Sequence, residues 1–94
     1  MLTTNSLLLR NTSMPSTDLD GEIVFLGMEA GKYFGLKGTG RRIWELLESP
    51  LTPDQLVSTL AAEYGIEPER CRADVEPFLD KLLGNGLLTQ SPTG

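Results

Sequence analysis

The chain has no histidine and only one cysteine, Cys71, among its 94 residues. Without a second cysteine it cannot form an intramolecular disulfide bond. Without histidine it has neither a Cys–His nucleophile pair nor the mixed ligand set that binds zinc in many proteins. We therefore expect no metal and no other cofactor.

Long hydrophobic runs and clustered positive charge are also missing. The longest apolar run near the start is Leu7–Leu9, which is too short for a signal-peptide core or a membrane span. There are 8 basic residues against 13 acidic ones, for a net charge of -5, and Arg41 and Arg42 form the only adjacent basic pair. Such a chain repels phosphate backbones. We expect a cytoplasmic protein, with a reduced thiol, that binds neither membrane nor nucleic acid.

One stretch, Gly31–Leu47, changes from strand-like to helix-like patterning, and the expected fold is organised around it. Lys32–Leu36 is short, aromatic and bounded by glycines, as a strand would be. Gly38 and Gly40 then interrupt it, and a helix is predicted from about Thr39 to Glu48. Its apolar residues recur at helical spacing and are Ile43, Trp44, Leu46 and Leu47.

Upstream of this stretch the pattern predicts strands. Glu22–Met28 is rich in branched and aromatic residues. It should pair antiparallel with Lys32–Leu36 through a short connection at 29–31. Ser6–Arg10 is a candidate for a further strand, and the polar segment 11–21 is interpreted as a loop. Alternation within the hairpin places Phe34 and Leu36 on its core face.

Downstream, two more helices are predicted. Thr52, Pro53 and Gln55 form the signature of a capped helix start, and Gly65 is suited to end that helix. The stripe expected to be buried on this second helix is Leu56, Val57, Leu60, Ala61 and Tyr64.

The third helix should run from about Pro68 to Gly84, with a bend at Pro77. Its apolar residues cover an arc roughly 140° wide, which is wider than contact with a single neighbouring element requires. These residues are Cys71, Val75, Phe78, Leu79, Leu82 and Leu83. The chain is expected to be one domain over residues 1–94, with flexible ends at 1–5 and 90–94.

Strands followed by helices predict an α+β fold with the helices on one face of a small antiparallel sheet. Three short helices beside such a sheet also describe a winged helix-turn-helix module. A nucleic-acid-binding or regulatory winged helix is therefore an alternative, although acidic residues outnumber basic ones on the third helix. A carrier domain would need an Asp-Ser-Leu-type attachment site, which the sequence lacks.

The polar residues give little support for a catalytic site. Asp18 and Asp20, and likewise Glu67 and Glu69, are adequately explained by solvation and by favourable placement near a helix start. Cys71 has no histidine to activate it and lies on an apolar stripe. The two glycines of the central stretch lack the Gly-Lys-Ser/Thr ending of a phosphate loop, so we interpret them as a tight turn.

The strand Lys32–Leu36 remains as a candidate site, because a sheet this small leaves it one free edge. An extended peptide could add a strand there and bond through its main chain. The residues alone leave peptide docking and ordinary edge protection by Lys32 and the glycines equally open.

The motifs GKYFGLKGTGRRIWELLES, the capped helix of residues 52–64 and IEPERCRADVEPFLDKLLGNGLL resemble the PqqD-like family. This family supplies the recognition elements that bind precursor leader peptides in the biosynthesis of ribosomally made, modified peptides (RiPPs). A free-standing chain of this size is most similar to the lasso-peptide type. Lys37 departs from the Asn more usual after the strand, and Pro77 is unexpected in the third helix.

The resemblance implies a three-stranded antiparallel sheet beside three helices and a non-catalytic adaptor. The leader would add to the third strand by beta-augmentation and lie against the third helix. A separate leader peptidase and a separate cyclase would then act on it. The peptide-binding residues implied are Lys32, Tyr33, Phe34, Gly35, Leu36, Cys71, Asp74, Val75, Phe78, Leu79 and Leu82.

Overall fold

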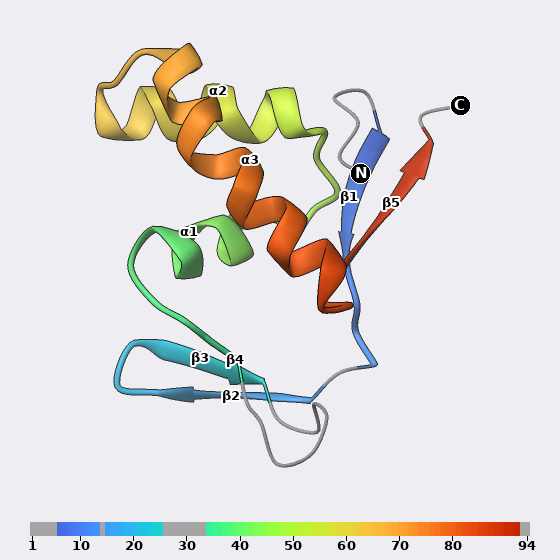
Figure 1. Cartoon of the computed structure of the whole chain (residues 1–94). Coiled ribbons are helices and arrows are strands. Elements are labelled where there is room, and N and C mark those ends of the chain that lie inside the picture. Colours follow the sequence, from blue (N-terminus) through green and yellow to red (C-terminus); the bar gives the residue numbers. More distant parts are fainter. Residues whose placement is uncertain (1–5, 14, 26–33, 93–94) are drawn as a thin grey trace.

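A computed structural model describes residues 6–13, 15–25 and 34–92 of the chain. It confirms an α+β fold in which a small sheet lies beneath a group of helices (Figure 1). The elements in chain order are β1 (Ser6–Arg10), β2 (Ser16–Leu19), β3 (Glu22–Phe25), β4 (Phe34–Leu36), α1 (Thr39–Leu46), α2 (Pro53–Tyr64), α3 (Pro68–Gly84) and β5 (Leu88–Pro92).

The main sheet has three antiparallel strands in the order β2-β3-β4. The predicted hairpin is confirmed, since β3 pairs with β4 in a register that places Phe25 opposite Phe34 and Ile23 opposite Leu36. These four side chains belong to the core or pack against it. The remainder of the hairpin expected from sequence, residues 26–33, lies outside the described residues.

The strand at the other edge of this sheet was not expected. We interpreted residues 11–21 as a loop, but Ser16–Leu19 forms β2 and pairs with β3. The turn between them is Asp20-Gly21, and both residues have positive φ, of 50° and 83°. Asp-Gly with two positive φ angles is the preferred two-residue hairpin turn, because its twist matches that of the strands. This turn holds β2 in the sheet although all four of its residues are exposed.

The strand Ser6–Arg10 is confirmed as β1, but its partner is the C-terminal strand β5 and not the main sheet. We expected a flexible tail from Gln90 onward. Instead Gln90, Ser91 and Pro92 pair with Leu8, Leu7 and Ser6. The two ends of the described chain therefore lie side by side as an antiparallel ribbon (Figure 1).

The helices follow the sequence signals closely. At the start of α2, Thr52 Oγ1 accepts a hydrogen bond from the Gln55 amide and the Gln55 side chain accepts one from the Thr52 amide, as predicted. Gly65 ends α2 in the left-handed conformation. Helix α3 runs from Pro68 to Gly84 and continues past Pro77, which lies on its exposed side.

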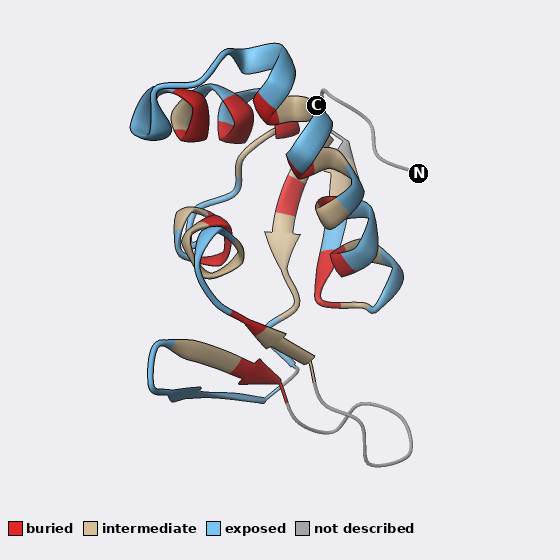
Figure 2. Cartoon of the chain, turned by 60° about the vertical axis from the view of Figure 1, so that its left-hand side comes forward, coloured by how far each residue is buried: buried red, intermediate tan, exposed pale blue. Residues whose placement is uncertain are grey.

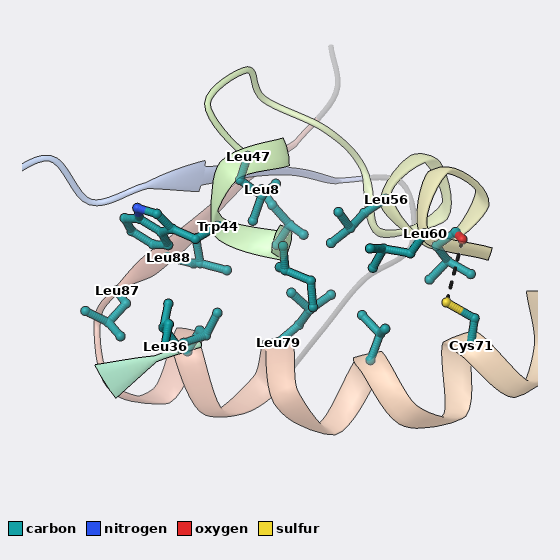
Figure 3. Close-up of a cluster of buried hydrophobic side chains, with 14 of the residues drawn as sticks. Leu8, Leu36, Trp44, Leu47, Leu56, Leu60, Cys71, Leu79, Leu87 and Leu88 are labelled. Atoms are coloured by element: carbon teal, nitrogen blue, oxygen red, sulfur yellow. Dashed lines mark hydrogen bonds between the residues drawn. The ribbon is translucent and has the colours of Figure 1, made fainter. Parts of the chain in front are cut away.

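The core forms where the inner faces of the helices meet the inner face of the sheet and strand β1 (Figures 2 and 3). Trp44 of α1 is 8% exposed, and its ring meets that of Phe25 edge-to-face at 4.8 Å between centroids. The predicted stripe of α2 is buried except for Tyr64, which is 48% exposed. That part of the prediction is wrong because Tyr64 is the last residue of α2, where the helix stops at Gly65.

Arg10 joins β1 to α1. Its guanidinium donates to the backbone oxygen of Trp44 and lies 4.8 Å from the centroid of the Trp44 ring. A cation near the C-terminal carbonyls of a helix, and over an aromatic face, is favourable on both counts. Within the described residues no helix is long and apolar enough to cross a membrane.

Candidate functional site

Strand β4 lies at an edge of the main sheet, because it pairs only with β3 among the described strands. In such a strand alternate backbone N–H and C=O groups point away from the sheet. Three residues of β4 are described, Phe34, Gly35 and Leu36, and Leu36 is 2% exposed while the other two are half-buried. The edge therefore offers backbone groups beside an apolar surface.

Helix α3 lies close to this edge. Lys81 of α3 places its Nζ 5.5 Å from the centroid of the Phe34 ring. Phe78 lies one helical turn earlier on α3, and its half-buried ring lies close to the start of α1. The side chain of Leu36 lies close to the same point. A Cβ built on Gly40 would lie 3.0 Å from Phe78 Cζ and 3.7 Å from Leu36 Cδ2. The middle of α3 and the end of β4 thus meet at Gly40.

A pocket of about 350 Å³ opens next to this meeting point. This is the low end of the size range of small-ligand pockets. Its walls come from the start of α1, the end of α2, the segment after it and the first half of α3. The lining residues are Thr39, Gly40, Ile43, Leu60, Tyr64, Ile66, Cys71, Asp74, Val75 and Phe78.

Two polar groups in the pocket wall differ in exposure. Asp74 is exposed, whereas Cys71 is 2% exposed and its Sγ donates a long hydrogen bond, 3.7 Å, to the backbone oxygen of Val57 (Figure 3). Burial raises the pKa of the Cys71 thiol, and the negative charge of Asp74 raises it further. The thiol is therefore held in its protonated form and is a poor nucleophile.

The predicted site residues that the structure describes fall into three groups. Cys71, Asp74, Val75 and Phe78 are brought together in the pocket wall. Phe34, Gly35 and Leu36 form the neighbouring edge strand. Leu79 and Leu82 lie on the same helix, but both are 0% exposed and belong to the core. Lys32 and Tyr33 lie outside the described residues.

Sequence reasoning missed the contribution of α1 and α2 to the pocket. Gly40 was interpreted only as part of a turn, and Tyr64 only as core. Ile66 was not singled out, although it is 38% exposed and follows directly on the helix-ending glycine. An apolar residue just after a Gly C-cap commonly packs back on its helix, and this signal could have identified Ile66.

Of the charged residues considered for catalysis or phosphate binding, Asp18, Arg41 and Arg42 are engaged in surface ion pairs. Arg41 bonds to Asp18 at 2.6 Å and Arg42 to Glu63 at 2.6 Å. The hydrogen bond from Arg41 is the main reason that the pKa of Asp18 is lowered. In the described part of the chain, no three residues of the metal-binding types are grouped so as to hold an ion.

Gly38 precedes α1 with a positive φ of 61°, as a tight strand-to-helix turn requires. This agrees with the turn interpretation of the two glycines in the central stretch.

Comparison with known proteins gives two matches. The family model for coenzyme PQQ synthesis protein D (PqqD) matches residues 22–88. A solved structure, TbiB1 in complex with the TbiA(beta) leader peptide, is similar with a TM-score of 0.71 and 35% sequence identity, covering 85% of this chain and 93% of that one. No curated protein sequence matches.

Proposed function

This chain belongs to the PqqD family, and from this we propose that it binds the leader segment of a ribosomally made precursor peptide as an added strand on β4. One observation carries the proposal: the end of the edge strand β4 meets, at Gly40, a pocket lined by α1, α2 and α3. The 35% identical TbiB1, whose structure is that of a leader-peptide complex, supports it.

Strand addition explains why a free strand edge and a pocket lie next to each other. An extended peptide gains affinity from main-chain hydrogen bonds along a sheet edge, and specificity from pockets that receive alternate side chains. In this chain the edge is Phe34–Leu36, and the pocket opens beyond its C-terminal end, at Gly40. Asp74 is the exposed carboxylate in the pocket wall and can accept a hydrogen bond from the peptide.

We propose that the remaining predicted residues also belong to the site. Lys32 and Tyr33 directly precede Phe34 in sequence. Leu79 and Leu82 support the site from the core beneath it. We propose no catalytic residue: the chain acts as an adaptor that presents the bound leader to a separate peptidase and a separate cyclase, as in lasso-peptide biosynthesis.

Hydrogen exchange tests strand addition directly. With the TbiA(beta) leader peptide, and with the leader of any short precursor encoded beside this chain, exchange should slow at Lys32–Leu36. It should change little in Glu22–Phe25, which is already paired on both sides. A peptide of the same composition in scrambled order is the control. Unchanged exchange at 34–36 under saturating leader contradicts the proposal.

The same peptides distinguish this function from a winged-helix nucleic-acid binder. Leader affinity should vary little between 50 and 200 mM salt, because backbone pairing and apolar contacts carry it. A protein with six or more phosphate contacts loses on the order of a thousandfold over that range. Steeply salt-dependent binding of duplex DNA, with no binding of leader, favours the winged helix.

Phe78→Asp tests which face of α3 is used. A charge in the proposed site should weaken leader binding by at least about 2 kcal/mol, the usual size of an interface hot spot. The thermal midpoint should fall less than in Leu60→Asp, the control, because Leu60 is 0% exposed and Phe78 only half-buried. If Phe78→Asp unfolds the domain, Phe78 is a core residue and the face is wrong.

A further inference from the structure

Gly40 has no conformational reason to be glycine. It lies in the first turn of α1, and it is absent from the described glycines with positive φ, which are Gly21, Gly38, Gly65 and Gly86. Any residue could adopt its backbone conformation, and glycine is the poorest helix former apart from proline. What distinguishes the position is its close neighbour, the ring of Phe78.

A side chain at position 40 would compete with that ring for space. The 3.0 Å between a Cβ on Gly40 and Phe78 Cζ is too short for relaxed contact, so the ring would have to move. Phe78 is only half-buried, and it lines the pocket together with Gly40. Because the ring is part of the pocket lining, a shift of a few tenths of an ångström that makes room for a Cβ at position 40 would change the shape of the pocket.

We propose that Gly40 sets the width of the pocket, and that this width lets the pocket take a ring-sized apolar side chain of the bound peptide. The inference rests on the proposed function for the identity of the occupant. The lining supports an apolar occupant, since it includes the apolar side chains of Ile43, Leu60 and Val75. Gly40 is thus a specificity-determining residue, acting through the position of Phe78.

The first experiment needs no peptide and uses toluene as the probe. Toluene should shift the methyl NMR signals of Ile43 and Val75 in the wild-type chain in a saturable way. Gly40→Ala should weaken toluene binding at least about threefold, and Gly40→Ala with Phe78→Leu should restore it because leucine is shorter. Gly84→Ala is the matched control, since Gly84 is also helical and a Cβ there would meet nothing within 4 Å. Equal toluene affinity in wild type and Gly40→Ala overturns the inference.

The second experiment uses whichever leader peptide binds the wild-type chain. Gly40→Ala should weaken it about tenfold, and Gly84→Ala, the matched control, should not. If Gly40→Ala loses toluene but keeps the leader, the pocket is not where the leader places a side chain, and the inference fails while the proposed function stands. If no leader binds the wild-type chain, the proposed function fails, and the occupant assigned here fails with it.

A folding check keeps both experiments interpretable. The thermal midpoint of Gly40→Ala should lie within a few degrees of that of Gly84→Ala. If Gly40→Ala does not fold, the single variant Phe78→Leu provides the test, because it should widen the pocket without altering α1. It should then favour indole, a larger ring, over toluene more than the wild type does, and an unchanged preference overturns the inference.

Discussion

At the scale of single residues, Cys71 illustrates how position decides chemistry. It lies in the first turn of α3, where a helix dipole favours a thiolate, but it is 2% exposed and has Asp74 nearby. Burial and the carboxylate together outweigh the dipole and the neighbouring Arg72, so the pKa of the thiol is raised. The residue contributes packing to the pocket wall.

We predict that Cys71 reacts slowly with iodoacetamide in the folded chain. At pH 8 a raised pKa leaves less thiolate than a free cysteine has, and burial limits access, so alkylation should be at least about tenfold slower than in urea-unfolded chain. Cys71→Ser should stay folded and should leave leader binding and any assay with purified partner enzymes largely intact. Equal rates in folded and unfolded chain, or complete loss of turnover in a folded, leader-binding Cys71→Ser, would restore a nucleophile role.

At the scale of elements, surface ion pairs connect helices and strands that are distant in sequence. Arg41 links α1 to β2 through Asp18, Arg42 links α1 to α2 through Glu63, and Arg72 links α3 to α2 through Asp54. All three are at the surface, where single pairs contribute little to stability. Two of the three pairs connect α1, which carries one wall of the pocket, to β2 and α2.

The Arg42–Glu63 pair predicts a pH dependence. Hydrogen bonding from Arg42 lowers the pKa of Glu63 in the folded chain below its ordinary value. A lowered folded pKa gives stability that is present above the unfolded pKa and is lost as the pH falls through the folded one. The thermal midpoint of Glu63→Gln should therefore lie roughly 1–5 °C below wild type at pH 7, and the difference should vanish in acid.

Glu69→Gln is the control, because Glu69 is exposed in the first turn of α3 and no ion pair holds it among the described residues. The midpoint difference for Glu63→Gln should also shrink in 1 M salt, which screens exposed charges. A difference that persists unchanged at pH 3 would show that Glu63 acts through packing and not through its charge.

Elements with local signals were predictable, and elements held by distant partners were not. Helix α2 carries its own start at Thr52 and its own end at Gly65, so its bounds followed from the sequence. Strand β2 is polar and fully exposed, and only its Asp20-Gly21 turn reveals it. Strand β5 is a polar segment whose pairing depends on β1, about eighty residues away, as the register with Ser6–Arg10 shows.

The candidate site likewise has a part that the sequence predicts and a part that it does not. Helical periodicity placed Cys71, Val75 and Phe78 on one arc of α3, and the pocket contains all three. The opposite wall, at Gly40 and Ile66, depends on how α1 and the end of α2 pack against α3. Spacing within one element cannot reveal that tertiary arrangement, so this half of the pocket had to come from the structure.

At the scale of the whole molecule, the pairing of the chain ends closes the fold. Strand β1 contributes Leu8, which is 0% exposed, to the core, and β5 begins with Leu88, which is 2% exposed. Besides β5, β1 is held by the hydrogen bond from the Leu8 amide to the Leu51 oxygen at 2.7 Å and by the contacts of Arg10 with Trp44. The ribbon thus adds a full strand pairing to a strand whose other backbone pairing is a single bridge.

We predict that removing residues 89–94 destabilises the whole domain. The deletion takes the β5 partners of Leu9, Leu8, Leu7 and Ser6 and leaves the buried Leu88 in place. Losing several strand hydrogen bonds should cost about 2 kcal/mol or more, at the usual net contribution of 0.5–1.5 kcal/mol each. The control deletion of residues 93–94 alone keeps all of β5. Urea unfolding followed by the fluorescence of the buried Trp44 measures both. Equal unfolding midpoints for the two deletions would mean that β5 adds nothing to stability, and the N-terminal strand would then be held by the Leu51 bridge, the Arg10–Trp44 contacts and the core.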